Sequence, residues 1–399
     1  MACLGVSQPA IQPPTEPISQ PVTPATPASP IQPPSPAAQR AAALAKGLNL
    51  PHWFWLPVGG EKNFASPDFF TADDAKAIAA AGFTCVRIPI DPGRLFGGTA
   101  GFVNAGIVKK LDKALDILND SGLVAVIDLH ALGTQSEDLY DKQLHDDTKP
   151  TGKKAEENFI KNWTALAKHL SSRDPAKVVL ELLNEPVFEK APARWPAIQT
   201  KLLAAVRSEA PLHTVILTGG NWSSIDGLLA LPDPLPSDSN VIYTFHFYEP
   251  HTFTHQGATW GPPNWALFKD LPYPSTPEAL ETPAAKIEDR VARAEALWYG
   301  RERWDAAKVA ARLNRATIWA KQRNVVLWCG EFGVIAGAPG ESRQRWTADV
   351  RTSLERAGIG WCVWDWAGNF GLTPTRRPET GPRILDHAMI AALGLTPKP

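Results

Sequence analysis

The stretch AGIVKKLDKALDILNDSGLVAVIDLH, residues 105–130, joins two kinds of sequence pattern. In the first part, apolar residues recur every three or four positions, which predicts an amphipathic helix over 105–122. The second part, LVAVIDLH (123–130), is an almost continuous apolar run of the kind found in strands that are buried on both faces. A helix that leads directly into a buried strand is the repeating unit of parallel α/β folds.

The same alternation continues through most of the chain from about residue 44. Eight apolar segments are predicted as strands, and a helix or helix-like segment follows each of them. Eight such repeats in about 350 residues predict an α/β fold of the closed (β/α)8 TIM barrel type. A doubly wound open sheet is disfavoured because no G-x-G-x-x-G motif follows the first strand. The predicted strands are 44–50, 83–90, 123–130, 177–184, 213–219, 240–248, 325–333 and 359–366.

Residues 1–40 have a different composition, in which Pro alternates with Gln, Ser, Thr and Ala. Such a segment buries too little apolar surface to fold, so we expect a disordered linker or tether before a barrel domain over 41–399. Cys3, in MACLG, is either the lipidated residue of a bacterial lipoprotein precursor or an incidental cysteine.

The composition excludes two classes of protein. The formal net charge is −1, whereas nucleic-acid binding needs a basic face. No apolar run reaches the length of about 18 residues that a membrane-spanning helix needs. Fifteen Trp residues instead suit a ligand that has both apolar and polar surface.

Polar and aromatic residues occur repeatedly where the predicted strands end. The carboxyl ends of barrel strands form one rim, which carries the active site in enzymes of this architecture. Unrelated structural roles would scatter such residues over both ends of the barrel, so their convergence predicts a functional site at this rim. The residues are Arg87, His130, Asn184, Glu185, His246, Tyr248, Glu331, Trp364, Asp365 and Trp366.

Two glutamates in this set have no adjacent basic residue, Glu185 in VVLELLNEPVFE (178–189) and Glu331 in GEFG (330–333). An acid at the end of a buried strand is costly unless it is protonated, paired or functional. Two carboxyl groups that face one cleft push their pKa values apart, so one keeps its proton while the other is ionised. Hydrolysis of a glycosidic bond requires this combination, and we predict that both residues are catalytic.

The motifs LLNEP (182–186) and GEFG resemble those of glycoside hydrolase family 5, a clan A family of cellulase-like retaining glycosidases. The resemblance covers roughly residues 44–395. It implies hydrolysis by double displacement with no metal and no organic cofactor. The family's eight site residues are matched in order by Arg87, His130, Asn184, Glu185, His246, Tyr248, Glu331 and Trp364.

The resemblance also implies a role for each matching residue. Glu331 would be the nucleophile and Glu185 the acid/base, with their carboxyl groups about 5–5.5 Å apart. Arg87 would lie beneath Glu331 and keep it ionised, and Tyr248 would donate a hydrogen bond to it. Asn184 would bind the sugar 2-hydroxyl, His130 and His246 would bind hydroxyls or position Glu185, and Trp364 would form a floor under the sugar.

The alternation of side chains along strands gives one further prediction. Three cysteines each precede a predicted site residue by two positions, so they should face the barrel axis one layer below the site. They are Cys85, Cys329 and Cys362. We expect free buried thiols that pack as small apolar residues, and a Cys329–Cys362 disulfide is the alternative.

A long connection, 249–303, follows the sixth predicted strand. Connections of this length are usually functional or disordered, so we expect part of it to fold over the rim. Aromatic rings there could stack on the C–H faces of sugars, or they could merely pack the connection onto the barrel. The candidate platforms are Trp260 and Trp265 in the connection, and Trp53, Trp55, Trp222 and Trp366 near other strand ends.

Family frequency favours an endo-β-1,4-glucanase that acts on a β-glucan or related polysaccharide, with an endo-β-1,4-mannanase or an exo-β-glucosidase as alternatives. A non-catalytic carbohydrate-binding barrel would have lost one glutamate. A metal-dependent barrel hydrolase, with ligands among Asp128, His130, His246 and Asp365, usually has a His-x-His motif after its first strand, and this chain lacks it. We expect a secreted, periplasmic or cell-surface monomer.

Overall fold

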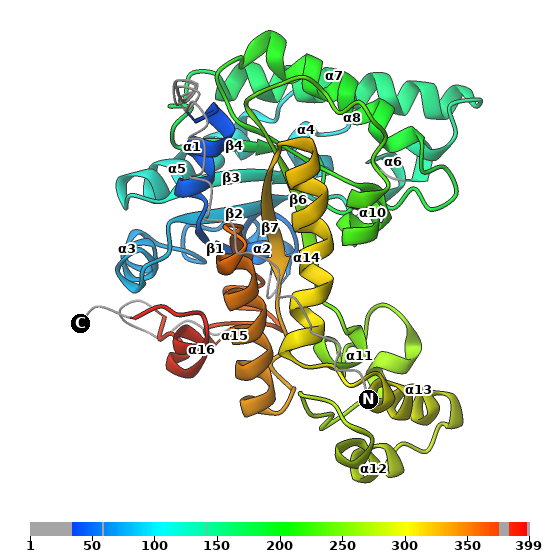
Figure 1. Ribbon diagram of the computed structural model, residues 1–399. Helices are drawn as coiled ribbons and strands as arrows, with labels where there is room; N and C mark the ends of the chain where they lie inside the picture. The colour runs from blue at the N-terminus through cyan, green and yellow to red at the C-terminus, as the bar shows by residue number, and fades with distance from the viewer. Residues whose placement is uncertain (1–33, 58–59, 141, 375–382, 397–399) are drawn as a thin grey trace, which may run out of the picture. The chain divides into compact units, whose positions relative to one another are not determined.

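The computed structural model of the chain describes residues 34–57, 60–140, 142–374 and 383–396; Cys3 and most of the Pro-rich segment lie outside these residues. Eight parallel strands close into a barrel in sequence order, and β8 pairs with β1 (Figure 1). The predicted (β/α)8 barrel is therefore confirmed. The strands are β1 (Lys46–Asn49), β2 (Cys85–Ile90), β3 (Val124–Leu129), β4 (Val178–Glu181), β5 (Val215–Thr218), β6 (Val241–Phe247), β7 (Val326–Phe332) and β8 (Gly360–Val363).

Amphipathic helices cover the outside of the strands. In α5 (Ala105–Asp120), Val108, Leu111, Leu115 and Leu118 form a buried stripe three or four positions apart, as the sequence predicts. The Asn104 side chain accepts the N–H groups of Gly106 and Ile107 and caps the helix. The other long helices are α3 (Ala72–Ala81), α7 (Pro150–Leu170), α8 (Arg194–Glu209), α14 (Ala306–Arg323) and α15 (Gly340–Arg356).

Shorter helices lie in the connections and near the carboxyl end of the chain. Gly219–Gly220 and Gly227 pack backbone to backbone between two of them, because a Cβ at Gly227 would lie 1.8 Å from the Gly220 carbonyl oxygen. The short helices are α2 (Pro51–Phe54), η1 (Glu61–Asn63), α4 (Pro92–Phe96), α6 (Glu137–Tyr140), η2 (Lys142–His145), α9 (Gly220–Ser223), α10 (Ile225–Leu229) and α16 (His387–Ala392).

Helix α1 (Pro36–Ala43) closes the amino-terminal end of the barrel. It begins inside the segment 1–40 that we expected to be a linker, because the Ser35 hydroxyl caps it and Ala37 packs into the barrel interior. The Leu44 carbonyl, directly after the helix, accepts a hydrogen bond from the indole N–H of Trp328 on β7. The described part of the barrel domain thus includes this helix.

The barrel interior is built in layers. The lowest layer is apolar and includes Cys85, Val126, Val179, Ile216, Ile242, Trp328 and Cys362. Side chains two positions further along each strand point to the same side and form the next layer. On the first four strands that layer is polar, and its residues are Asn49, Arg87, Asp128 and Glu181, all fully or almost fully buried.

The prediction for the cysteines is correct in part. Cys85, Cys329 and Cys362 are buried and free, so the disulfide alternative is wrong. Cys85 and Cys362 face the axis, where a Cβ at Gly47 would lie 2.8 and 2.9 Å from their sulfur atoms. Cys329 instead packs in the outer core, because the pairing of β7 with both neighbouring strands shifts register beyond this residue. The shift breaks the alternation and brings Glu331 into the barrel.

The connection 249–303 folds into a small helical unit after β6. Ile335 N–H donates to the Thr254 carbonyl and joins the unit to the loop after β7. Figure 1 shows its helices grouped beside the lower ends of α14 and α15. The elements are α11 (His251–Thr254), η3 (Pro263–Leu267), α12 (Pro277–Ala285) and α13 (Arg290–Glu302).

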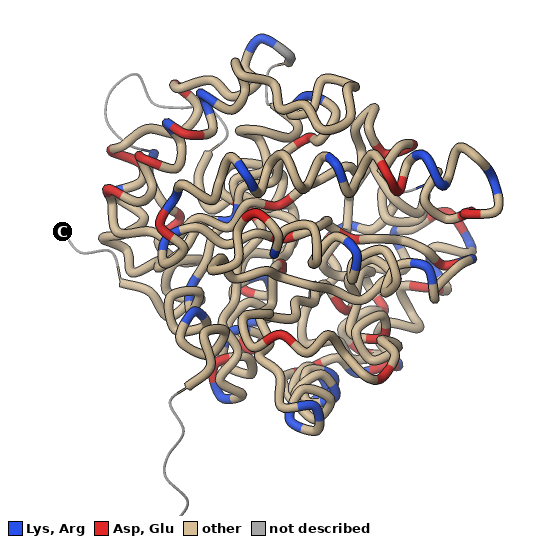
Figure 2. Tube along the Cα trace, turned by 90° about the horizontal axis from the view of Figure 1, so that it is seen from above, with Lys and Arg blue, Asp and Glu red and all other residues tan. Residues whose placement is uncertain are grey.

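Charged residues of both signs are interspersed over the described part of the chain (Figure 2). The full sequence has 40 Lys and Arg residues against 41 Asp and Glu residues, so the two signs also balance in number. Among the helices described, none combines the length and hydropathy needed to cross a membrane.

Candidate active site

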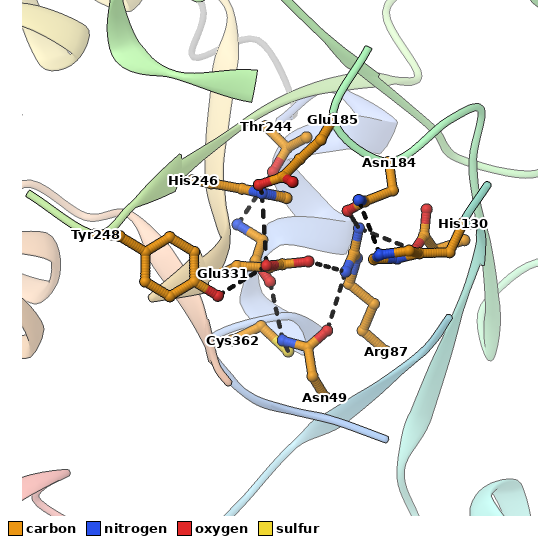
Figure 3. Close-up of polar contacts among 12 residues, drawn as sticks. Asn49, Arg87, His130, Asn184, Glu185, Thr244, His246, Tyr248, Glu331 and Cys362 are labelled. Atoms are coloured by element: carbon orange, nitrogen blue, oxygen red, sulfur yellow. Dashed lines mark hydrogen bonds and ion pairs between the residues drawn. The ribbon is translucent and has the colours of Figure 1, made fainter. Parts of the chain in front are cut away.

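Arg87, on β2, lies at the centre of a buried polar cluster at the carboxyl end of the barrel (Figure 3). Its Nη1 donates to Glu331 Oε1 at 2.6 Å and to Asn49 Oδ1 at 3.1 Å. Its Nη2 donates to Asn184 Oδ1 at 2.8 Å and lies 3.0 Å from Asp128 Oδ2. A fully buried guanidinium is costly unless such partners satisfy its donors, and here residues from four segments of the chain do so.

Glu331 receives two hydrogen bonds on its carboxylate. Arg87 donates to Oε1, and the Tyr248 hydroxyl donates to Oε2 at 2.8 Å. Both donors stabilise the charged form of the carboxyl group. These contacts are the ones that the family resemblance implies, with Arg87 beneath the glutamate and Tyr248 beside it.

Glu185 approaches Glu331 from the loop after β4. Its φ is 43°, a left-handed conformation that non-glycine residues adopt at a cost. Its Oε1 accepts a hydrogen bond from His246 Nδ1 at 2.8 Å, and the same Nδ1 lies 3.6 Å from Glu331 Oε2. One oxygen from each glutamate and one ring nitrogen of His246 all lie within 4.8 Å of one another. The two carboxyl groups therefore face one another closely enough to act on the same bound ligand.

Burial raises the pKa of both glutamates to about 7. Burial also lowers the pKa of His246 to about 4, so its imidazole is neutral at neutral pH. The carboxyl group of Glu331 therefore accepts hydrogen bonds from a cation, Arg87, and from a phenol, Tyr248. The carboxyl group of Glu185 is instead hydrogen-bonded to a neutral imidazole. Hydrogen bonds from a cation and a phenol favour the charged form of Glu331 more than a single imidazole favours that of Glu185, while burial raises the pKa of each carboxyl group to about 7.

His130 and Asn184 form a second chain of hydrogen bonds beside Arg87. His130 Nδ1 donates to Asp128 Oδ2 at 2.9 Å, and its Nε2 accepts from Asn184 Nδ2 at 3.0 Å. The Asn184 backbone N–H donates to the Leu129 carbonyl and anchors the loop to β3. Hydrogen bonds thus hold both the oxygen and the nitrogen of the Asn184 side-chain amide, and one N–H of the amide is left for a ligand.

The aromatic candidates lie in different surroundings. Trp55 lies at the site, with its ring centroid 4.1 Å from His130 and 6.0 Å from Trp364. Trp222 and Trp260 are exposed, whereas Trp265 stacks on His251 within the helical unit. The predictions for Trp53 and Trp366 as platforms are wrong, because both rings are buried in the core against Phe70.

Three residues of the cluster were not predicted from the sequence as members of the active site. Asn49, Asp128 and Glu181 all contact Arg87, and Asp128 had been weighed only as a metal ligand. The signal was present, because Glu181 and Asp128 each follow an inward apolar residue, Val179 and Val126, by two positions.

Within the part of the chain that the structure describes, the four candidate ligands of a metal-dependent hydrolase do not come together as one site. Asp128 is bound by Arg87 and His130, whereas Asp365 accepts the Gly368 N–H and lies 3.8 Å from His52. Among the described residues, the grouping that could offer three ligand atoms to an ion is Glu185, His246 and Glu331. In it, His246 Nδ1 and Glu185 Oε1 are hydrogen-bonded to each other.

Comparison with known proteins gives consistent matches. The family described as "Cellulase (glycosyl hydrolase family 5)" matches residues 52–370. Endoglucanase C of Acetivibrio thermocellus is 30% identical over 324 residues, which cover 80% of this chain and 90% of that protein. Cellodextrinase A of Ruminococcus flavefaciens is 27% identical over 322 residues, covering 80% and 84%. The crystal structure of a hyperthermophilic endo-β-1,4-glucanase with substrate aligns at 26% identity and a TM-score of 0.69, covering 90% and 99%.

Proposed function

The chain belongs to glycoside hydrolase family 5, and from that premise we propose that it is a retaining endo-β-1,4-glucanase with Glu331 as nucleophile and Glu185 as acid/base. The observation that carries this proposal is the pair of carboxylates, whose oxygens approach within 4.8 Å in unlike surroundings. The matching endoglucanases support a β-1,4-glucan as the substrate.

In the first half of the reaction, Glu331 attacks the anomeric carbon while Glu185 gives its proton to the leaving oxygen. Arg87 and Tyr248 keep Glu331 ionised until it attacks. The attack forms a glycosyl ester with the carboxylate, and the C–O bond to the leaving sugar breaks. Asn184 is held by Arg87 and His130 with its free N–H available for the sugar 2-hydroxyl.

In the second half, Glu185 is an anion and removes a proton from a water molecule that attacks the same anomeric carbon. The ester bond to Glu331 breaks, the sugar leaves with its original configuration, and both glutamates return to their starting states. Neutral His246 donates to Glu185 and so supports its charged form during this half.

Aromatic rings around the pair supply surfaces for sugar stacking in this proposal. Trp364 and Trp55 lie beside His130 at one side of the pair. Trp222, on the loop after β5, and Trp260, in the helical unit, expose their rings. The ring centroid of Phe370 lies 6.3 Å from that of Trp260 and 5.9 Å from that of Tyr248. Trp260 would therefore contact a sugar unit that is only a few units along the polymer from the cleavage point.

A product profile on soluble polymers tests the substrate and the mode of cleavage. On carboxymethyl-cellulose, we expect viscosity to fall early relative to the release of reducing ends, and slower hydrolysis of mannan, xyloglucan and laminarin. Faster turnover of mannan would assign the mannanase alternative, and release of glucose from chain ends without loss of viscosity would assign the exo-glucosidase.

A second experiment separates an enzyme from a sugar-binding barrel. We expect Glu331→Gln to lose turnover and to keep binding cello-oligosaccharides, because the amide retains the size of the carboxylate but lacks its nucleophilicity. NMR of the first product should show the β-anomer, as retention requires. An α-anomer would overturn the assignment of Glu331 as a nucleophile.

The nature of the substrate also supports a location outside the cytoplasm. A β-glucan polymer does not enter a cell, so an endo-acting enzyme must be exported to reach it. Secretion, a periplasmic position and attachment through Cys3 all meet this requirement. Labelling of the native precursor with a radioactive fatty acid, compared with its Cys3→Ala variant, tests the attachment, and monomeric mass in light scattering tests the expected oligomeric state.

A further inference from the structure

Glu181, the last residue of β4, makes a two-point contact with Arg87. Its Oε2 lies 2.7 Å from Nε, and its Oε1 lies 2.9 Å from Nη2. Its side chain is 1% exposed, so it lies beneath the reaction centre rather than in contact with a sugar. A bidentate pair of this kind fixes the plane of the guanidinium as well as its position.

The plane of this guanidinium determines where its remaining donors point. Nη1 donates to Glu331, on β7, and Nη2 donates to Asn184, on the loop after β4. The same rigid group therefore holds both the nucleophile and the amide that would meet the sugar. A rotation of the guanidinium would displace both contacts together.

The other partners of Arg87 give weaker constraints on its orientation. Asn49 accepts one hydrogen bond at 3.1 Å. Asp128 uses only Oδ2, which it shares with His130, while its buried Oδ1 has no hydrogen-bond partner. Neither residue offers two acceptors to the edge of the guanidinium, so neither can replace the contact with Glu181.

We propose that Glu181 is a positioning residue, which holds Arg87 in the orientation that presents Glu331 and Asn184 to the substrate. This inference rests on the proposed function of Glu331 as the nucleophile. Glu181 acts only through Arg87, and no bond to the substrate forms or breaks at Glu181.

The charge of Glu181 provides a readout that a purely structural residue would lack. The charged and titratable groups that interact with it are Arg87 on β2, Asp128 on β3, Glu185 after β4 and His246 on β6. His130 and Glu331 are one contact further away, since they are bound to Asp128 and Arg87. Burial raises the pKa of Glu185, and the negative charge of Glu181 raises it further. Removal of that charge lowers this pKa, so the basic limb of the pH profile moves to lower pH.

The test compares Glu181→Gln with Glu156→Gln in the full chain. Glu156, on α7, is a matched control, because it is also buried and accepts hydrogen bonds from Arg194 and Lys201 on the outside of the barrel. For Glu181→Gln we expect kcat to fall about 10- to 100-fold with KM within about twofold, and the basic limb to move down by about one pH unit. For Glu156→Gln we expect a lower Tm with unchanged kcat and pH profile.

Glu181→Asp extends the test. The aspartate keeps the negative charge, but its shorter side chain reaches Arg87 for one hydrogen bond rather than two. We expect kcat between those of the wild type and Glu181→Gln, an unmoved basic limb, and a Tm close to that of the wild type. Wild-type kcat and pH profile in a folded Glu181 variant would overturn the positioning role. Retained turnover in Glu331→Gln would instead overturn the proposed function, so the two failures are distinguishable.

Discussion

The hydrogen bond from Tyr248 to Glu331 allows a quantitative prediction. Tyr248→Phe removes one donor to Oε2 at 2.8 Å and leaves the donor from Arg87 at 2.6 Å in place. Burial raises the pKa of the Tyr248 phenol well above its ordinary value, so the hydroxyl donates over the whole working pH range. A hydrogen bond to a charged group contributes about 1.5–3 kcal/mol, and one pKa unit corresponds to about 1.4 kcal/mol.

These magnitudes predict that the pKa of Glu331 rises by about one to two units in Tyr248→Phe. The sign follows from the contact, because the lost donor stabilised the charged form of the carboxyl group. In the proposed mechanism the two glutamates compete for one proton, and the active form carries it on Glu185. Stronger proton binding by Glu331 therefore reduces the active fraction, and we expect the maximum kcat/KM to fall about 10- to 100-fold.

Initial rates on carboxymethyl-cellulose between about pH 4 and pH 9 measure this effect, since the acidic limb reports the ionisation of the nucleophile. We expect that limb to move to higher pH in Tyr248→Phe. Tyr273→Phe is the matched control, because Tyr273 donates to Asp349 at the same distance of 2.8 Å in the helical unit. A Tyr248→Phe profile that superimposes on those of the wild type and the control would refute this reasoning.

Three other results are expected. Glu185→Ala should lose about 10²- to 10⁴-fold in turnover of polymers, yet retain much of its activity on an aryl glycoside whose leaving group needs no proton; equal losses on both substrates would argue against the acid role. Trp53→Ala should cost about 3–5 kcal/mol of stability, whereas Trp222→Ala should raise KM at unchanged Tm, as measured by denaturation and steady-state kinetics. The three buried cysteines should react with a thiol reagent only after denaturation, and native reactivity of any of them would contradict the packing.

The barrel and the two glutamates could be predicted from the sequence because both depend on local patterns. Each strand is an apolar run, and each site residue lies at or just beyond the end of such a run. The predicted strands were too long at several ends. The LLN segment after Glu181, for example, is as apolar as a strand but turns away as a loop to present Glu185 at a φ of 43°. Hydrophobicity alone does not distinguish a buried strand from a buried loop.

The environment of individual tryptophans could not be predicted in this way. Trp53 and Trp55 are two positions apart, so strand alternation would give them the same face. They instead belong to the short helix α2 and its end, and one ring is in the core while the other lies at the site. Trp366 lies beyond β8, where the strand period no longer applies. Cys329 faced outward for a related reason, since the register of β7 shifts beside it.

The site divides into two parts that differ in how they are held. Arg87, Glu181 and Glu331 lie on strands, and their carboxylates and guanidinium are buried where isolated charges would be strongly destabilising. Such a cluster is stable because the charges of its members neutralise one another and their hydrogen-bonding groups are paired. Removing one member therefore leaves an unpaired charge in the barrel. The surfaces that would select the polymer, Trp222 and Trp260, lie on connections that can change without disturbing this layer. Residues on the strands and directly after them therefore indicate the reaction from sequence patterns, whereas the choice of polysaccharide depends on longer connections whose geometry those patterns do not determine.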